Sequence, residues 1–478
     1  MGRSIGNLHL MNSHDNNTGK SSRVKVAALL LGPLLALVLF WGLQQAGFTN
    51  AVATTAGVTL LCVLWWVFEP VPIPVTSLLP LTLLPLFGII TQKEASEAYG
   101  NSLVLLLLGG FILSTAMESS GAHRRVALGM VRLFGGSSSK RLVFGFMAAS
   151  AMLSMWISNT ATTLMLLPVA LAVLSKSDDP DLSVPLLLGI AFAANLGGIG
   201  TPIGTPPNIL FMAIYRETTG EEVSFLTWMS WGIPVILIFL PLMALWLTRN
   251  LRFSGKIDLP EVGAWSTAEK RVLMVFVATA ILWITRKAPF GGWTDLMDFS
   301  YTNDGIVALL AVVVMFIIPN GKGGTLLTWE TAAKIPWGVL ILFGGGIAIA
   351  TAFGTSGLSA IIGEALGALA SVHNLFIILI ICLTVTFLTE ATSNTATTAL
   401  LMPLLAATAV AAAIDPRLLM VPAAMSASCA FMLPVATGPN AIVFGTGKFT
   451  VKAMVREGVA LNFIGVLAIT CVCYFYFA

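Results

Sequence analysis

The chain has 478 residues, of which 57% are hydrophobic and 10% are charged, whereas about a quarter of the residues in an ordinary soluble protein carry charge. This composition excludes a water-soluble globule. A net charge of +3 is too small to indicate a nucleic-acid partner. The five cysteines lie in apolar segments without metal-ligand spacing and are interpreted as small core residues: Cys62, Cys382, Cys429, Cys471 and Cys473.

Long stretches without Asp, Glu, Lys or Arg indicate helices that span a lipid bilayer. They cover residues 26–68, 142–175, 182–215, 223–248, 391–414 and 418–447. A spanning helix needs about 20 apolar residues, and these stretches lack the alternation of a transmembrane β-barrel. The sequence therefore predicts an all-α polytopic membrane protein in contact with membrane lipid.

The positions of Lys and Arg predict how the chain crosses the membrane. Residues 1–25 are polar and end in Arg23 and Lys25, which predicts a cytoplasmic tail before an uncleaved first span. Basic loops near 124–141, 249–271 and 448–456 are also placed in the cytoplasm, and the C-terminus is expected outside. Eleven spans are expected, near residues 26–46, 54–70, 76–91, 102–122, 184–215, 225–248, 270–288, 304–319, 337–363, 418–447 and 457–477.

Two further apolar segments predict re-entrant hairpins. Residues 142–175 carry Ser158-Asn159-Thr160 at their middle, so each arm has about 16 residues, too few to cross comfortably. This hairpin is expected to enter and leave on the cytoplasmic side. Residues 373–413 repeat the pattern after five predicted crossings and are therefore expected to open to the outside.

The internal repeat is the most informative pattern in the chain. Residues 158–163 (SNTATT) recur without change at 393–398, and each copy is followed by a proline at the same distance. Gly109-Gly110 matches Gly344-Gly345, and Thr205-Pro206-Pro207-Asn208 matches Thr437-Gly438-Pro439-Asn440. An odd number of crossings between the copies predicts an inverted repeat, with a first half at 26–250 and a second half at 251–478.

Each repeated motif interrupts an apolar segment, which is tolerated at membrane depth where the freed backbone groups line a cavity or are buried in protein. The N–H groups of the helices that restart there favour carboxylate or phosphate. The carbonyls before each break, with Ser, Thr and Asn oxygens, favour a hard cation. Because the motif segments contain no Lys, Arg or His, bound sodium is expected to balance a bound dianion. Small polar stretches also serve as plain helix-packing surface, but the exact duplication favours a binding site.

Glu390 lies four residues before Asn394 and has no acidic twin in the first half. An intramembrane carboxylate is a functional candidate. An orienting hydrogen-bond role is favoured over a proton or cation role.

The paired Ser-Asn-Thr tips, each followed by a break of the type Thr-x-Pro-Asn, resemble the divalent anion/sodium symporter family, the INDY-type carriers. The resemblance runs from about residue 25 to the C-terminus. It implies a homodimer in the inner (plasma) membrane of a bacterium, with a scaffold domain and a transport domain that moves like an elevator. It also implies sodium-coupled uptake of C4-dicarboxylates such as succinate, fumarate and malate, with Na+ as the coupling ion and no organic cofactor.

The resemblance assigns candidate residues to each ligand. A first sodium site is expected on Ser154, Ser158, Asn159 and Gly204, and a second on Thr389, Thr392, Asn394 and Ala436. The substrate is expected to contact Ser158, Asn159, Thr160, Thr205, Ser393, Asn394, Thr395, Thr437 and Gly438. Gly438 departs from the family pattern, where bacterial dicarboxylate carriers tend to have proline, and leaves the size of the ligand open.

Several alternatives remain open. The same fold could carry sulfate, citrate or another anion, or exchange dicarboxylates without sodium. A channel also uses oxygen-lined breaks. An enzyme is not expected, because no His-Glu-x-x-His motif or pair of intramembrane carboxylates is present, and an ATP-driven pump would need a Gly-x-x-x-x-Gly-Lys-Ser/Thr loop, which is absent.

Overall fold

The computed structural model describes residues 5–134, 138–177, 179, 181–251, 263–299, 301–366 and 372–478, with the backbone alone at 5–22 and 363–366. These residues form helices and connecting turns, apart from one isolated β-bridge between Pro319 and Thr325. The expected boundary between the two halves adjoins 252–262, and residues 1–4 of the expected tail also lie outside the described residues.

The helices of the first half include both arms of the first hairpin. In chain order they are α1 (Ile5–Gln45), α2 (Asn50–Phe68), α3 (Ile73–Thr76), α4 (Leu78–Leu86), α5 (Gln92–Tyr99), α6 (Ser102–Ser120), α7 (Ala122–Phe134), α8 (Ser139–Ser154), α9 (Asn159–Leu174), α10 (Ser183–Gly197), the 3-10 turn η1 (Gly198–Gly200), α11 (Pro206–Thr219) and α12 (Phe225–Leu247).

The second half repeats this order from α17 onward. Its helices are α13 (Thr267–Ile284), α14 (Gly292–Leu296), α15 (Asp304–Ile317), α16 (Trp329–Ala332), α17 (Trp337–Ser356), α18 (Leu358–Leu366), α19 (Asn374–Thr389), α20 (Asn394–Ala411), α21 (Pro416–Ala427), α22 (Gly438–Phe444) and α23 (Val451–Phe477).

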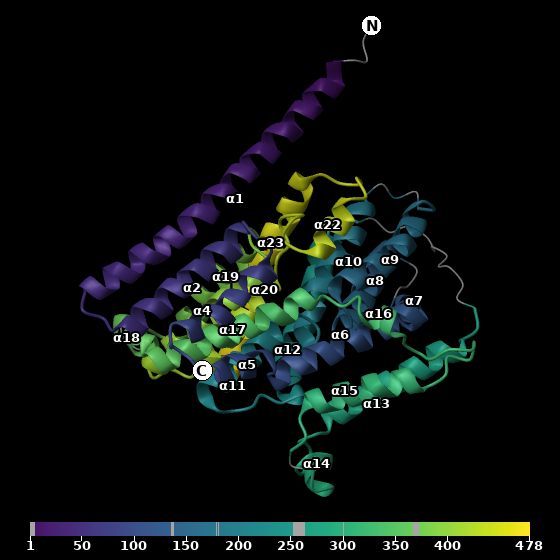
Figure 1. Cartoon of the computed structure of the whole chain (residues 1–478). Coiled ribbons are helices and arrows are strands. Elements are labelled where there is room, and N and C mark those ends of the chain that lie inside the picture. The colour runs from purple at the N-terminus through teal and green to yellow at the C-terminus, as the bar shows by residue number, and fades with distance from the viewer. Residues whose placement is uncertain are drawn as a thin grey trace.

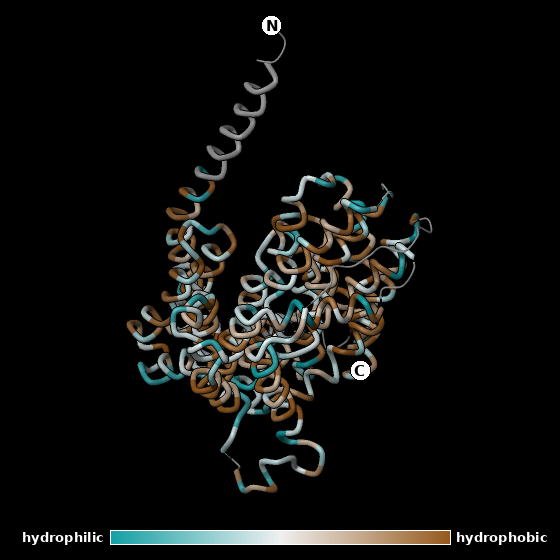
Figure 2. The backbone as a smooth tube through the Cα atoms, turned by 90° about the vertical axis from the view of Figure 1, so that its right-hand side faces the viewer, coloured by the Kyte–Doolittle hydropathy of each residue, from teal (hydrophilic) through white to brown (hydrophobic). Residues whose placement is uncertain are grey.

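The structure confirms the predicted polytopic all-α architecture. Within the described residues, eight helices are long and apolar enough to cross a membrane, and four shorter apolar segments accompany them. Figure 2 shows that many residues along the packed helices are hydrophobic and that hydrophilic residues are frequent at the ends of the helices. The protein is a multi-pass membrane protein.

Both expected hairpins are present and break where the motifs predicted. The arms α8 and α9 meet between Ser154 and Asn159, and α19 and α20 meet between Thr389 and Asn394. Each arm has 16 to 18 residues, about 24–27 Å of helix. The three arms of 16 residues are short of the roughly 30 Å hydrocarbon core, whereas α20, with 18 residues, is one of the eight helices that are long enough to cross a membrane. Re-entrant geometry stays a prediction. Five segments lie between the hairpins: α10 with α11, α12, α13, α15 and α17. That each of them crosses the membrane stays a prediction.

Several expected continuous spans are broken in the structure. Span 76–91 is divided at Ser77 between α3 and α4, and 337–363 is divided at Gly357, whose φ of 82° ends α17. Spans 184–215 and 418–447 are divided at the Thr-x-Pro-Asn motifs, as their prolines require. The first helix starts at Ile5 instead of near residue 26; it lies beside α2 and extends away from the bundle (Figure 1).

The two halves interlock at their breaks. Helix α9 packs on α22 of the other half, α20 packs on α11, and α10 packs on α22. Glycine makes close approach possible at equivalent places: a Cβ on Gly232 of α12 would collide with the carbonyl of Ile199, and one on Gly458 of α23 with the carbonyl of Phe431. The breaks of both halves are therefore held in one core.

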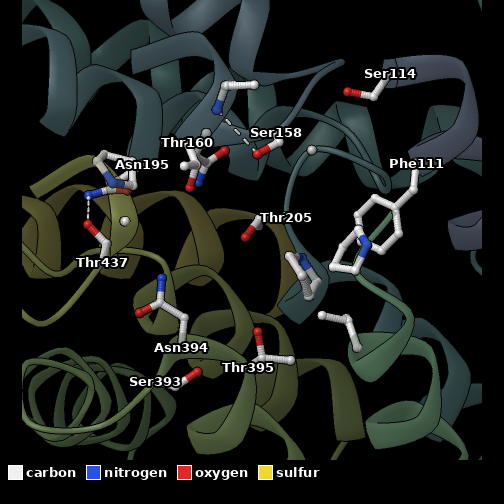
Figure 3. A pocket seen from close by; sticks show the side chains of 18 of the residues that line it. Phe111, Ser114, Ser158, Thr160, Asn195, Thr205, Ser393, Asn394, Thr395 and Thr437 are labelled. Atoms are coloured by element: carbon white, nitrogen blue, oxygen red, sulfur yellow. Dashed lines mark hydrogen bonds between the residues drawn. The ribbon is translucent and has the colours of Figure 1, made fainter. Parts of the chain in front are cut away.

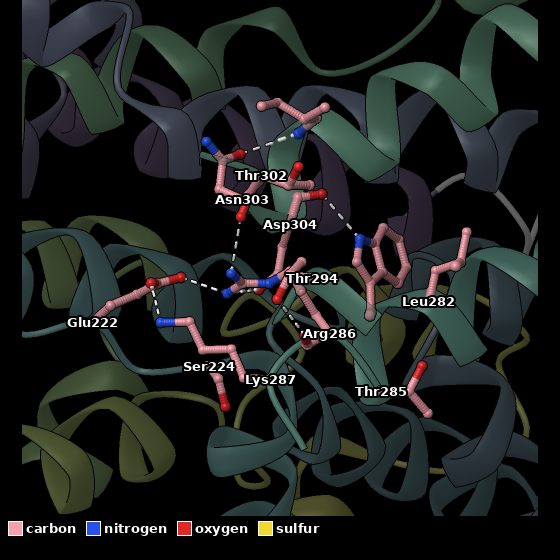
Figure 4. Close-up of polar contacts among 12 residues, drawn as sticks. Glu222, Ser224, Leu282, Thr285, Arg286, Lys287, Thr294, Thr302, Asn303 and Asp304 are labelled. Atoms are coloured by element: carbon pink, nitrogen blue, oxygen red, sulfur yellow. Dashed lines mark hydrogen bonds and ion pairs between the residues drawn. The ribbon is translucent and has the colours of Figure 1, made fainter. Parts of the chain in front are cut away.

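An ion-pair network surrounds the buried guanidinium of Arg286. The guanidinium of Arg286 donates to Asp304 at 2.6 Å and to Glu222 at 2.5 Å, and Lys287 donates to Glu222 at 2.6 Å (Figure 4). The network ties the end of α13 to the start of α15 and to the loop between α11 and α12.

Candidate functional site

A cavity of about 740 Å³ lies where the four broken segments meet. All nine residues expected to contact substrate line it: Ser158, Asn159, Thr160, Thr205, Ser393, Asn394, Thr395, Thr437 and Gly438. Figure 3 shows Ser158 and Thr160 on one side of this space and Ser393, Asn394 and Thr395 on the opposite side, with Thr205 between them. Residues 235 positions apart in the chain thus face one another.

The helices that begin at the cavity carry unequal sets of free N–H groups. The two hairpin helices start with Asn159-Thr160 and Asn394-Thr395, which have ordinary backbone N–H groups. Helix α11 starts with two prolines and α22 with glycine and proline, and proline has no N–H to donate. The hairpin tips therefore supply most of the backbone donors for an anion.

Side-chain capping differs among the four helix starts at the cavity. The hydroxyl of Ser158 accepts the N–H of Ala161 at 3.4 Å, and that of Thr437 accepts the N–H of Asn440 at 3.3 Å. Ser393 and Thr205 stand at N-cap positions but accept no such bond. The hydroxyls of Ser393 and Thr205 line the cavity instead of capping.

The expected sodium residues form two equivalent hydrogen-bonded pairs directly behind the tips. Ser154 Oγ donates to Asn159 Oδ1 at 2.5 Å, and Thr389 Oγ1 donates to Asn394 Oδ1 at 2.8 Å. Ser154 and Thr389 are fully buried. Each pair fixes an amide so that its oxygen lies at the break of its own hairpin.

Oxygen atoms converge at the first break. A methyl group added to Gly198 would lie 3.0 Å from Asn159 Oδ1 and 3.2 Å from the carbonyl oxygen of Gly204, and one added to Gly204 would lie 3.0 Å from the carbonyl oxygen of Met155. Carbonyl and amide oxygens suit hard cations. These donors are all oxygen atoms, so the set fits a hard cation such as sodium better than a soft transition metal.

Of the second expected sodium set, Thr392, Asn394 and Ala436 line the cavity. The hydroxyl of Thr392 also lies 2.5 Å from that of Thr397 and donates to the carbonyl of Leu388 at 2.9 Å. Ala436 has no polar side-chain atom, so only its backbone could contribute an oxygen to a sodium site. The assignment of individual residues to sodium and to substrate stays a prediction.

Two asparagines hold the broken loops in the same way. Asn208 Nδ2 donates to the carbonyls of Gly198 and Thr201 at 2.8 and 2.7 Å, and Asn440 Nδ2 donates to those of Ala430 and Leu433 at 2.9 and 3.1 Å. Each donor and its acceptors are displaced by 232 positions between the halves. The asparagine of each Thr-x-Pro-Asn motif is therefore a brace for the break.

Asn195 is a site residue that the sequence did not reveal. Its amide donates to Thr437 Oγ1 at 3.0 Å (Figure 3). It also donates to Asn440 Oδ1 at 3.2 Å, and it lines the cavity. It joins the first half to the break of the second. The signal was an asparagine outside the repeated motifs in the charge-free stretch 182–215, and its position in the second half is taken by Ala427.

The cavity also reaches charged residues outside the motifs. Glu69, Glu118 and Lys334 line its wall together with Trp66 and Phe111. The motif segments themselves contain no basic residue, as the sequence indicated, but Lys334 brings one cation to the same cavity. The tertiary structure alone places it there, because residue 334 lies far from both motifs in the chain.

An apolar helical bundle whose broken helices meet at a cavity is the architecture of many secondary transporters. Residues 63–421 match the family described as citrate transporter. The chain belongs to this transporter family, and the expected membership of the divalent anion/sodium symporters is confirmed.

Curated relatives match almost the whole chain. It is 40% identical to the sodium-dependent dicarboxylate transporter SdcS of Staphylococcus saprophyticus over 494 residues, covering 98% of this chain and 94% of the relative. It is also 40% identical to SdcS of Staphylococcus aureus over 478 residues, covering 94% and 91%. These relatives are transporters and not enzymes.

Solved structures share the fold at low sequence identity. The YdaH transporter of Alcanivorax borkumensis aligns with a TM-score of 0.58 and 16% identity over 81% of this chain and 87% of that one. MtrF of Neisseria gonorrhoeae, described as one of a class of antimetabolite efflux pumps, aligns with a TM-score of 0.55 and 14% identity over 80% and 82%. Both likenesses support the fold.

Proposed function

We propose that this protein couples sodium to the uptake of C4-dicarboxylates such as succinate, fumarate and malate. The observation that carries the proposal is the single cavity lined by both Ser-Asn-Thr tips. Two opposed helix N-termini can each receive one carboxylate of a short dianion. The relatives named as sodium-dependent dicarboxylate transporters support this substrate class.

Sodium occupies the two oxygen-lined breaks behind the tips in this proposal. The amides of Asn159 and Asn394 belong both to the sodium sites and to the cavity wall. Bound sodium then orders the tip and supplies positive charge where the dianion binds. Cation and anion binding are coupled through these two shared side chains.

The remaining features follow the family resemblance. The protein is a homodimer in the inner membrane of a bacterium, with its N-terminus in the cytoplasm and its C-terminus outside. The tail at 1–25 precedes two inverted halves, 26–250 and 251–478, whose hairpins 142–175 and 373–413 face the cytoplasm and the outside. A transport domain that contains both hairpins moves against a scaffold domain as an elevator.

Uptake into proteoliposomes tests the proposal. Labelled succinate, citrate and sulfate are supplied side by side under an inward sodium gradient, and again under an equal potassium gradient. Succinate is expected to accumulate in sodium and not in potassium. Equal succinate uptake in both gradients would refute sodium coupling, and preferred uptake of citrate or sulfate would refute the substrate assignment.

Citrate is the competing substrate that specific observations favour. The matching family is described as citrate transporter, and the cavity of about 740 Å³ is roomy for a C4 acid. The side-by-side uptake measurement separates the two acids directly.

A further inference from the structure

A second concave surface lies on the outside of the bundle, between α12 and α23. It is an apolar groove of about 560 Å³. Its walls are formed mainly by aliphatic side chains: Ile238, Leu242, Leu245, Ile464, Leu467 and Ala468. Of these, Leu245 is 68% exposed and Leu467 is 58% exposed. We call this surface the α12/α23 groove.

The length of the groove is close to that of one leaflet of a bilayer. Its wall on α12 runs from Ile238 to Trp246, a separation of eight residues that spans about 12 Å of helix, and Arg249 lies just beyond the end of α12. Half of a hydrocarbon core of about 30 Å is about 15 Å. Most of one extended acyl chain therefore fits along the groove.

The groove ends in a positively charged cluster. Arg249 donates through both terminal nitrogens to Glu457 at 2.7 and 3.1 Å, and Arg456 donates to the same carboxylate at 3.0 Å. Two guanidinium groups share one carboxylate, so the cluster keeps one net positive charge. The side chain of Arg456 is 70% exposed. Arginine is well suited to bind phosphate oxygens.

The remaining side chains of the cluster orient Arg249. Its guanidinium lies 4.1 Å from the centre of the Trp246 ring, a cation–π contact, and it also donates to the Trp246 carbonyl at 2.6 Å. Trp246 lines the groove as well. Tryptophan and arginine at the end of an apolar surface are typical of the membrane interface.

We propose that the α12/α23 groove is a binding site for an anionic phospholipid. One acyl chain lies along the aliphatic walls, and the phosphate lies against Arg249 and Arg456. A lipid fits better than a second copy of the chain. A twofold axis along the membrane normal would bring the same positive cluster of the partner to the same depth, and the two like charges would repel.

Native mass spectrometry of the intact protein measures this preference. The protein is incubated with phosphatidylglycerol or with phosphatidylcholine that has the same acyl chains. Phosphatidylglycerol is expected to bind more tightly. Arg456→Gln is expected to reduce that preference about fivefold, the effect of one basic residue at an anionic surface. Lys93→Gln, at an 83% exposed side chain on α5, is the matched control and should leave the preference unchanged.

The aliphatic part of the site needs a separate variant. Leu245→Trp places a large ring in the groove at an exposed position and is expected to weaken binding of both lipids. Leu310→Trp, at a 61% exposed position on α15, is the control and should leave binding unchanged. Succinate uptake by each variant verifies that it is folded.

Cys471 provides a second readout, because it lines the groove and is exposed whereas Cys62, Cys382, Cys429 and Cys473 are buried. Phosphatidylglycerol is expected to slow its labelling by a membrane-soluble maleimide more than phosphatidylcholine does, and Arg456→Gln should remove the difference.

Equal binding and equal protection by the two lipids would overturn the proposal. Efficient Cys471–Cys471 cross-linking in membranes would also overturn it and identify the groove as a contact between copies.

Discussion

The carboxylate of Glu390 accepts the backbone N–H of Phe431 at 2.6 Å. The same side chain also accepts the N–H groups of Met432 and Leu433 at 2.9 and 3.1 Å and the amide of Asn462 at 2.8 Å. Glu390 directly follows α19, and 431–433 belong to the break between α21 and α22. One buried carboxylate therefore joins the tip of the second hairpin to the second break, in the orienting role that the sequence favoured.

The first half makes the equivalent connection without a charge. Met155 stands at the position of Glu390, and its backbone carbonyl accepts the hydroxyl of Thr201. Thr201 and Leu433 are equivalent positions of the two breaks. The repeat thus preserves the connection and changes its chemistry.

Glu390→Gln is expected to lower succinate uptake at least tenfold and to raise the sodium concentration needed for half-maximal uptake. The amide nitrogen of glutamine cannot accept the N–H of Leu433, so a buried donor loses its partner at a cost of about 1–3 kcal/mol. The measurement is the sodium dependence of the initial uptake rate. Glu97→Gln, at a 64% exposed side chain, is the control. A variant with the sodium dependence of the wild type would exclude a positioning role.

Asn159→Ala and Asn394→Ala are each expected to abolish transport and to leave expression unchanged. Each removes the amide that is held by Ser154 or Thr389 and removes little core volume. Uptake of labelled succinate and the yield of folded protein are measured together. Asn320→Ala, in a loop between α15 and α16, is the control. Normal transport by either variant would mean that the repeat is structural.

Gly438→Ala is expected to lower the thermal stability, and the loss should shrink when Thr160→Ala is present. A Cβ on Gly438 would lie 2.5 Å from Thr160 Oγ1, a contact that cannot form without displacement of Thr160. The contact crosses the two halves, so the two substitutions should be coupled by about 0.5–3 kcal/mol in a double-mutant cycle. Additive effects on the melting temperature would contradict the direct contact.

Arg286→Met is expected to destabilise the protein by about 3–5 kcal/mol. The guanidinium is 3% exposed and pairs with Asp304, whose side chain is 5% exposed, so its removal leaves a buried carboxylate without its partner. Lys287→Met, at a 47% exposed side chain, should cost at most about 1 kcal/mol. Thermal unfolding in detergent compares the two. Equal losses of stability in the two variants would contradict the expectation that burial makes Arg286 the more important of the two residues.

The same network predicts a loss of stability in acid. Partial burial raises the pKa of Glu222. The hydrogen bond and charge of Lys287 and the charge of Arg286 lower the pKa by more than burial raises it, so the pKa lies below its usual value of 4.5. A carboxylate with a lowered pKa in the folded state stabilises the protein above its unfolded pKa, and the contribution disappears as the pH falls through the folded pKa. Thermal unfolding between about pH 6 and pH 3 should therefore show a steeper loss for the wild type than for Glu222→Gln. Parallel curves would contradict this contribution.

The sequence by itself determined the class of the protein and the location of its breaks. Long charge-free stretches without alternation form helices in a bilayer, because a helix satisfies the hydrogen bonds of its own backbone. The duplicated Ser-Asn-Thr and Thr-x-Pro-Asn motifs marked where those helices stop, because proline and capping residues act through local geometry. The helix breaks of both hairpins follow from these local signals, whereas the assignment of nine residues to the substrate came from the family resemblance.

Only the tertiary structure decided which distant groups meet. Asn195 joins the second break and Lys334 reaches the cavity, although neither stands in a motif. Glu222 pairs with Arg286 across 64 positions, and Glu390 binds backbone groups that carry no sequence signal. Periodicity and capping depend on neighbours in the chain, whereas these contacts depend on how the halves pack, and that packing is set by surfaces far apart in sequence.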